Sequence, residues 1–421
     1  MSSGTADRLA RGAVAAALFA CTLAVAGCGW PSPEPPPADP AARPANWSTV
    51  ASDELLAPAR GVVVTDRSGE LSYVASSLNA VDGDDGTIWI SPPKDTVQWL
   101  VVELPALTKI RQVGASTGDP GSITGPVKTL RFEGSVDGIT FTGLQTVDLA
   151  TKQGPQLFDV TPTEVRFLKV TTLANHKDNE VTLVPSLHAR GEELEPVPPP
   201  SFSGRWNVNG HELDLSQDGN VVYGVVRMEP PMIFYGTVAG RGARLAWSRG
   251  NENGIARLDV DPSSTHLSGL WWWIDPLLNF NLGEAWISQR VGDAPRFTVP
   301  IPKIADVHIR KVGRFPLYGL VFRPDGDLDL EASASGLGFI RQALASFPTY
   351  KVRLEVVACD SWIEAKNLEA ARARASRLAA GLERSGLPKE RIVVEGRSRT
   401  DLVRPIYRLM YDQVEFSLAG N

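Results

Sequence analysis

The spacing of hydrophobic residues differs between three segments of the chain. In the first segment, apolar and polar residues alternate in short runs bounded by turn residues, at Trp99–Leu104, Thr129–Gly134 and Arg166–Val170. Alternation with a period of two is typical of strands buried on one face. The even spacing of the runs predicts an all-β sandwich over residues 46–193.

In the second segment, short apolar runs recur with glycine turns about every ten residues. They lie at Gly204–Trp206, Leu213–Gln217, Val222–Gly224, Leu245–Trp247 and Leu267–Gly269. This spacing predicts a small antiparallel β domain over residues 201–291, either an up-and-down barrel or a half-barrel.

Three consecutive tryptophans, Trp271–Trp273, stand in this second segment. On a strand, Trp271 and Trp273 would share one face and Trp272 would point to the other. Two interpretations stay open at this point. The side chains form a stacking platform or an interface, or two of them belong to the core and one to its rim.

In the third segment the period becomes helical. Leu337, Ile340 and Leu344 fit one helix face, and a second helix runs from Asn367 to Ser385 before Gly386. Strands are predicted at Leu354–Ala358, Arg391–Glu395 and Gln413–Leu418. With a strand before the first helix, the order β-α-β-α-β-β predicts an α/β sandwich over residues 304–421.

Proline-rich stretches separate the segments, so the chain is predicted to be multidomain. Residues 28–45 are too rich in proline to pack and favour extended polyproline II, which would span roughly 3.1 Å per residue. A second break lies at Pro196–Pro200, and a softer one runs from Asp293 to Pro302. The 421 residues are sufficient for three domains.

The N-terminus has the pattern of an export signal. Arg8 and Arg11 precede an apolar run that ends in Val25-Ala26-Gly27-Cys28. This resembles the lipobox of bacterial lipoproteins, which implies removal of residues 1–27 and lipidation of Cys28, with the acyl chains anchoring the protein in a membrane. The alternative is an ordinary secretory signal with a coincidental cysteine.

The cysteines and the residue after Cys28 add two expectations. Cys21 would leave with the signal peptide, so Cys359 would remain alone, without an internal disulfide or a cysteine-based metal cluster. Gly29 stands where enterobacterial lipoproteins retained in the inner membrane carry aspartate. The resemblance therefore implies a lipid anchor in the outer membrane, facing the periplasm.

Composition and motif searches exclude several functional classes. A net charge of −6 argues against a nucleic-acid partner, and 43% hydrophobic residues argue against general disorder. The sequence contains no Gly-x-Ser-x-Gly, His-Glu-x-x-His, P-loop or Gly-x-Gly-x-x-Gly motif, and its five histidines are scattered. We therefore expect a protein that is not an enzyme.

The first segment resembles the discoidin-like, or coagulation-factor type C (F5/8 type C), family. The resemblance rests on Asn79–Trp89, Gln98–Leu104, Ser135–Gly138 and Val165–Val170. It implies an eight-stranded jelly roll that binds sugars, lipid head groups or protein at loops on one end.

The same resemblance implies a structural calcium ion at Asp82, Asp85 and Thr87, whose closely spaced oxygens suit a hard cation. Ser186 stands near the position where the family often has a glutamate. The alternative is that the aspartates and glycines of this loop are only turn formers.

The third segment resembles the OmpA-like C-terminal domain, which holds outer membranes to peptidoglycan. Ala358-Cys359-Asp360 and the run from Asn367 to Ala375 carry the resemblance. It implies that Asp360, Asn367 and Arg374 bind the diaminopimelate of the peptidoglycan stem peptide. A carboxylate can hold the ammonium of that residue, and a guanidinium can bind its carboxylate through two hydrogen bonds.

Departures from this pattern leave alternatives open. Cys359 replaces the usual threonine, and Asp412-Gln413 replace a pair of arginines. Arg374 could instead belong to a solvated charged face with Arg372 and Arg377.

The expected function is a non-enzymatic outer-membrane lipoprotein that binds peptidoglycan and a second glycan or protein. The alternative is a cell-surface interaction scaffold whose third domain no longer binds peptidoglycan.

Overall fold

A computed structural model describes most of the chain beyond the N-terminal region. The described residues are 54–57, 60–72, 74–118, 125–178, 180–196, 200–274, 283–323, 326–359, 363–400, 410 and 413–419. The export signal, Cys28 and the linker 28–45 lie outside them. Residues 45–421 form one compact unit. Among the described residues, no helix combines the length and the apolar character needed to cross a membrane.

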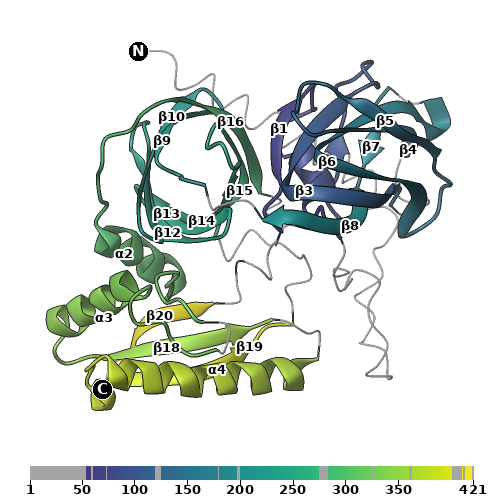
Figure 1. The fold of residues 1–421 in the computed structure, drawn as a ribbon. Helices are drawn as coiled ribbons and strands as arrows, with labels where there is room; N and C mark the ends of the chain where they lie inside the picture. The colour runs from purple at the N-terminus through teal and green to yellow at the C-terminus, as the bar shows by residue number, and fades with distance from the viewer. Residues whose placement is uncertain are drawn as a thin grey trace, which may run out of the picture. The chain divides into compact units, whose positions relative to one another are not determined.

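The first domain is a β-sandwich of eight strands (Figure 1). Its strands are β1 (Val63–Arg67), β2 (Trp89–Ile90), β3 (Trp99–Ser116), β4 (Val127–Ser135), β5 (Thr142–Asp148), β6 (Pro155–Asn175), β7 (Leu183–Val184) and β8 (Ser186–Pro196). The larger sheet has the order β1-β3-β6-β4-β5, with β8 also paired to β3, and β2 pairs with β7. The predicted β-sandwich is confirmed. Trp89 and Phe132 are fully buried in its core.

The second domain is a closed barrel of eight antiparallel strands. Its strands are β9 (Gly204–Val208), β10 (His211–Asp218), β11 (Val221–Val226), β12 (Met232–Ala239), β13 (Gly242–Arg249), β14 (Glu252–Val260), β15 (His266–Trp273) and β16 (Glu284–Gly292). Each strand pairs with the next one along the chain, and β16 pairs with β9. Of the two predicted forms, the structure has the full barrel.

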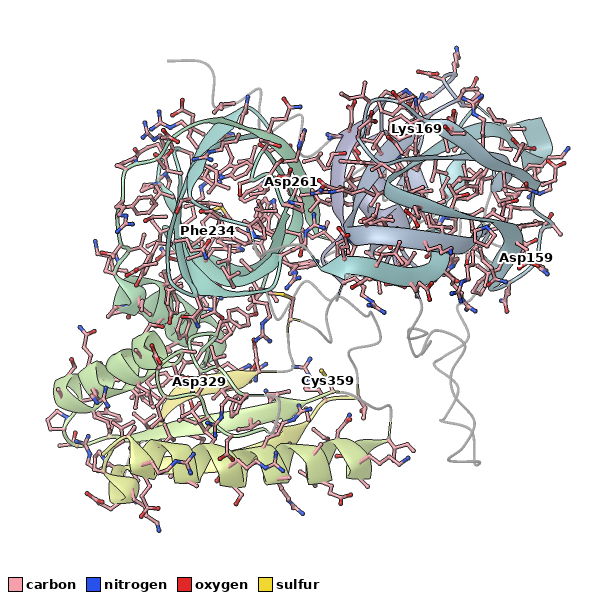
Figure 2. All side chains as sticks on the ribbon, viewed as in Figure 1. Asp159, Lys169, Phe234, Asp261, Asp329 and Cys359 are labelled. Atoms are coloured by element: carbon pink, nitrogen blue, oxygen red, sulfur yellow. The ribbon has the colours of Figure 1, made fainter. Side chains whose placement is uncertain are left out.

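Aromatic side chains fill one level of the barrel interior. Trp247 contacts Trp271 and Trp273, with ring centroids 5.4 and 6.2 Å apart. Phe234, labelled in Figure 2, contacts Trp286 edge-on at 5.8 Å. Trp272 belongs to the apolar cluster outside the barrel and is 2% exposed. The predicted division of the three tryptophans between two faces is confirmed, and all three contribute to packing.

The third domain combines helices with a mixed sheet of four strands. Its elements are α2 (Ile301–Val312), β17 (Phe315–Pro316), α3 (Ala334–Ser346), β18 (Lys351–Ala358), α4 (Glu364–Arg384), β19 (Ile392–Ser398) and β20 (Val414–Ala419). The sheet order is β17-β20-β18-β19, in which only β18 and β19 are parallel. From β17 onward, the elements follow the order β-α-β-α-β-β.

The two faces of this sheet differ in chemistry. Val352, Leu354 and Val356 share one face and are buried in the core. Gly396 lies on the same face, where an added Cβ would lie 2.5 Å from the backbone of α4. The opposite face carries charged residues, including Arg397, which pairs with Glu355 and Glu415. The helices therefore cover the apolar face.

Helix α2 is an element that the sequence pattern did not predict. It begins directly after Pro300, has Pro302 in its first turn and ends at Gly313, whose φ is +76°. Proline in the first turn and glycine directly after the last turn are typical at the two ends of a helix. The prolines at the predicted linker therefore begin a helix. His308 on α2 is fully buried and hydrogen-bonds to Asn253 and to the carbonyl oxygen of Trp247 in the barrel.

Candidate functional site

The loop from Asp82 to Thr87 brings four oxygen atoms together. It follows the short 3-10 helix η2 (Ser77–Val81), and the side chains of Asp82 and Thr87 are buried. The Thr87 hydroxyl lies 3.0 and 2.8 Å from the two carboxylate oxygens of Asp82 and 2.9 Å from the carbonyl oxygen of Asp84. The backbone N–H groups of Asp84 and Thr87 also donate into this cluster, to the Asp82 carboxylate at 3.0 Å and to the Asp84 carbonyl oxygen at 3.1 Å.

Closely spaced carboxylate, hydroxyl and carbonyl oxygens are ligands that suit a hard cation such as Ca²⁺. Of the three residues predicted for calcium, Asp82 and Thr87 are in the cluster, whereas Asp85 is exposed and makes none of these contacts. Within the described residues, no group of three or more His, Cys, Asp or Glu side chains could hold a metal ion. The loop therefore offers one carboxylate together with neutral oxygens.

The Asp82 loop adjoins a small cavity between the sandwich and the barrel. The cavity measures about 40 Å³, and its lining includes Asp82 and Leu78 from the sandwich and Arg257, Asp259 and Ser268 from the barrel. Arg257 donates two hydrogen bonds to the carboxylate of Asp259, at 2.7 and 3.1 Å. Polar groups of both domains thus line one small pocket.

Two hydrogen bonds join the sandwich and the barrel beside this cavity. The backbone N–H of Val64 donates to the Ser268 hydroxyl at 3.2 Å. The guanidinium of Arg241 donates to the carbonyl oxygen of Leu104 at 2.7 Å. Arg241 is 6% exposed, so its charge is removed from water at the junction of the two domains.

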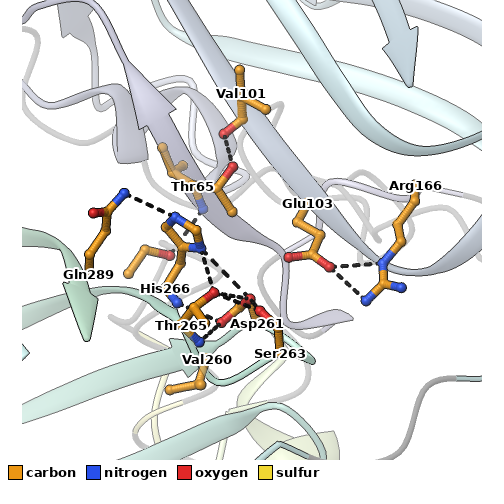
Figure 3. Close-up of polar contacts among 12 residues, drawn as sticks. Thr65, Val101, Glu103, Arg166, Val260, Asp261, Ser263, Thr265, His266 and Gln289 are labelled. Atoms are coloured by element: carbon orange, nitrogen blue, oxygen red, sulfur yellow. Dashed lines mark hydrogen bonds and ion pairs between the residues drawn. The ribbon is translucent and has the colours of Figure 1, made fainter. Parts of the chain in front are cut away.

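Buried ionisable groups surround these contacts. Burial raises the pKa of Glu103, although Arg241 and Arg166 oppose the shift, and Arg166 donates to this carboxylate at 2.9 Å (Figure 3). Burial also raises the pKa of Asp259, although the charge and the hydrogen bonds of Arg257 lower it. Burial lowers the pKa of Arg241 in spite of the nearby carboxylates. In all three groups the largest cause of the shift is removal of the charge from water.

Asp261 organises the turn between β14 and β15 at the edge of this junction (Figure 3). Burial alone would raise its pKa, but hydrogen bonds from His266, Ser263 and Thr265 outweigh burial and hold the pKa well below its usual range. The N–H groups of Thr265 and His266 donate to the carboxylate at 2.7 and 2.6 Å. Asp261 is therefore a structural carboxylate of the hairpin.

The outer face of the sandwich carries half-buried aromatic rings beside a cation. The Lys169 ammonium, on β6, lies 4.9 Å from the ring centroid of Trp99 and 5.7 Å from that of Phe141 (Figure 2). The turn before Phe141 is fixed by Asp137, whose carboxylate accepts N–H bonds from Ile139 and Thr140 at 2.8 Å. Aromatic rings next to a polar group can contact the apolar and hydroxylated faces of a sugar.

In the third domain, Asn367 lies where the parallel strands β18 and β19 end. Its buried side-chain amide donates to the carbonyl oxygen of Arg399 at 3.0 Å, and Arg399 N–H donates to the carbonyl oxygen of Ala358 at 3.1 Å. Cys359, labelled in Figure 2, follows the end of β18 and is buried. Asp360, the carboxylate predicted to bind the ligand, lies outside the described residues.

Arg374 lies on α4 seven residues after Asn367, two helical turns away on nearly the same side. It is half-buried, whereas Arg372 and Arg377 are exposed. Arg374 is therefore less exposed than the two arginines with which it could form one solvated face. Asn367 lies outside the carboxyl ends of β18 and β19, the one parallel pair among the described strands of this sheet.

The junction residues Arg241, Arg257 and Asp259 were not singled out from the sequence. One signal was present, because Arg257 and Asp259 alternate with buried Ala256, Leu258 and Val260 on β14. Charged residues on the outer face of a barrel strand are ordinary when that face meets water. Only the fold shows that this face meets another domain.

Residues 64–187 match the family model of the F5/8 type C domain. The first domain is therefore of the F5/8 type C, or discoidin-like, type, as its resemblance implied. No curated protein matches the chain.

Solved structures similar to the chain include isolated modules from bacterial glycan-degrading proteins. One is the C-terminal domain of a chitobiase from Bacteroides fragilis, with 18% identity, a TM-score of 0.31, and coverage of 34% of this chain and 100% of that one. Another is CBM32-3 of a family 31 glycoside hydrolase from Clostridium perfringens, with 19% identity, a TM-score of 0.28, and coverage of 31% and 92%. A third is CpGH89CBM32-5 from Clostridium perfringens, in complex with GalNAc-β-1,3-galactose, with 17% identity, a TM-score of 0.29, and coverage of 32% and 99%.

Proposed function

We propose that the protein is a non-enzymatic, lipid-anchored protein of the outer membrane that binds glycans of the cell envelope. Cys28 would carry the lipid, and the F5/8 type C domain would bind a carbohydrate or protein ligand. The third domain would bind the diaminopimelate stem peptide of peptidoglycan on the periplasmic side. The observation that carries this third assignment is that Asn367 lies at the carboxyl ends of β18 and β19 and Arg374 follows two turns later on nearly the same side of α4.

The chemistry of that edge supports a zwitterionic ligand. The half-buried guanidinium of Arg374 can bind a carboxylate through two hydrogen bonds, and the Asp360 carboxylate can hold an ammonium. Asn367 would act as a positioning residue, because its amide ties α4 to the end of β19. Binding by charge-assisted hydrogen bonds needs no covalent step.

This assignment predicts selective binding of the stem peptide. A soluble form of residues 46–421 should bind a muramyl tripeptide that ends in meso-diaminopimelate. Calorimetric titration should show an affinity that falls as the salt concentration rises. The same peptide ending in lysine lacks the second carboxylate and should bind at least about tenfold more weakly. Equal affinity for the two peptides would contradict the role of Arg374.

For the F5/8 type C domain, we propose a glycan surface at Trp99 and Phe141. Replacing Trp99 by Ala should lower the affinity for the best ligand on a glycan array about tenfold, because an aromatic stacking contact contributes about 1 kcal/mol or more. Phe347→Ala offers a control, since Phe347 is a 43% exposed aromatic residue at the end of α3, in the third domain. An unchanged array profile for Trp99→Ala would place the ligand elsewhere on the domain.

The Asp82 loop is our proposed calcium site. The Asp82 carboxylate, the Thr87 hydroxyl and the Asp84 carbonyl oxygen would hold the ion, and Asp85 would contribute only long-range charge. Bound calcium would place a positive charge beside the Asp82 carboxylate and would stabilise the loop.

A further inference from the structure

A buried amide of the third domain has an acceptor atom without a donor. Gln413 stands directly before β20, and its side chain is 8% exposed. The Oε1 atom of this side chain is buried and accepts no hydrogen bond from any described residue. Most buried acceptors in folded proteins are paired, because an unpaired one is unfavourable. The free acceptor indicates a donor that the described part of the chain does not supply.

Gln413 is joined to the strand ends at which Asn367 is bound. The N–H of Val357, near the end of β18, donates to the carbonyl oxygen of Gln413 at 2.8 Å. The carbonyl oxygen of the next residue, Ala358, accepts from the N–H of Arg399, and the carbonyl oxygen of Arg399 accepts from the Asn367 amide. Gln413 and Asn367 therefore lie on either side of the end of β18.

The separation of these two residues suits a short peptide. In the sheet, β18 lies between β20 and β19. Neighbouring strands are about 4.8 Å apart, so the backbone of Gln413 is roughly 10 Å from the backbone at the end of β19. An extended tripeptide spans about 10 Å.

The chemistry of an amide oxygen favours the ammonium of the proposed ligand. An ammonium has three N–H donors, and a single carboxylate such as that of Asp360 fills only part of this capacity. A neutral amide oxygen adds an acceptor without a negative charge, so it does not oppose the binding of the ligand carboxylate by Arg374. Gln413 stands where the OmpA-like pattern has arginine, which has donors only.

We propose that Gln413 binds the side-chain ammonium of diaminopimelate through its Oε1 atom and sets the preference of the third domain for stem peptides that carry this amine. The inference rests on the proposed peptidoglycan site and adds a binding residue to it. A side chain whose acceptor is filled only by the ligand contributes to binding and not to folding.

Calorimetric titration of residues 46–421 with two muramyl tripeptides tests the inference. One peptide ends in meso-diaminopimelate, and the other ends in 2-aminopimelate, which lacks the second amino group. Gln413→Leu should bind the first peptide about tenfold more weakly than the wild type, as expected for the loss of a hydrogen bond to a charged group. The two proteins should bind the second peptide equally, because that ligand lacks the partner of Oε1.

The urea concentration at half-unfolding separates this role from a structural one. Leucine is similar in size to glutamine and has no polar side-chain atom, so Gln413→Leu removes the unpaired acceptor. The variant should unfold at the same urea concentration as the wild type or at a higher one. Ser417→Ala is the control on the same strand, because Ser417 pairs with Arg353 towards the other end of β18. It should leave both peptide affinities unchanged.

The outcomes distinguish the site from the role of Gln413. No binding of the diaminopimelate peptide by a folded wild type would overturn the proposed peptidoglycan site together with this inference. Equal binding of that peptide by the wild type and Gln413→Leu would overturn the role of Gln413 and leave the site standing. An equal loss of affinity for both peptides, or unfolding of Gln413→Leu at a lower urea concentration, would do the same.

Discussion

Replacing Arg241 by Ala should destabilise the protein by about 3–5 kcal/mol, which is typical for removing one partner from a buried ionic cluster. Arg241 is 6% exposed, donates to the Leu104 carbonyl oxygen, and acts electrostatically on the buried carboxylates of Glu103 and Asp259. Without it, Glu103 would keep only Arg166 as a compensating cation. The free energy of unfolding in urea measures the loss.

Arg111→Ala is the control for this prediction. Arg111 pairs with Glu192 at 2.7 Å, but both side chains are at least half exposed, so the loss should stay below about 1 kcal/mol. Similar losses for the two variants would show that the junction does not depend on the buried charge of Arg241.

The second large effect is a loss of stability on acidification, caused by His308. Burial lowers the pKa of His308 to about 4, and its bond to the Trp247 carbonyl oxygen only partly opposes this shift. In the unfolded chain the imidazole takes up a proton near its usual value of 6.5. The stability contribution of neutral His308 is therefore complete above about pH 6.5 and is lost as the pH falls towards about 4.

The expected contribution is about 3 kcal/mol, from a shift of about 2.5 pKa units at roughly 1.36 kcal/mol each. His308→Gln removes the titration and retains an amide that can donate to the Trp247 carbonyl oxygen. Unfolding free energies measured from pH 7 to pH 4 should fall more steeply for the wild type than for His308→Gln. Parallel curves would show that His308 does not titrate in this way.

The sequence predicted the sandwich and the barrel because the period of two in a strand is a local property. Even so, β3 and β6 extend far beyond the predicted runs, to 18 and 21 residues. Their pairing shifts register between Glu103 and Thr108, where a bulge breaks the alternation on which the prediction relied. The start of α2 was missed because Pro300 and Pro302 mark both linkers and helix beginnings.

The candidate site was accessible from the sequence only in part. The contact between Asp82 and Thr87 is local, so the spacing of these residues predicted that the two side chains lie together, whereas Asp85 points away from them. The burial of Asn367 and its bond to Arg399 depend on how α4 packs against β19, which no spacing specifies. Arg257 and Asp259 line a cavity with residues of the sandwich only because two domains meet at β14, a contact between residues distant in sequence.

Sedimentation with purified diaminopimelate-type peptidoglycan sacculi tests the central claim most directly. Residues 46–421 should sediment with the sacculi at low salt, and Asp360→Ala and Arg374→Ala should stay in the supernatant. Arg372→Ala, which removes an exposed arginine from the same helix, should sediment like the wild type. A wild-type protein that stays in the supernatant at low salt, or equal sedimentation of all four proteins, would contradict peptidoglycan binding by the third domain.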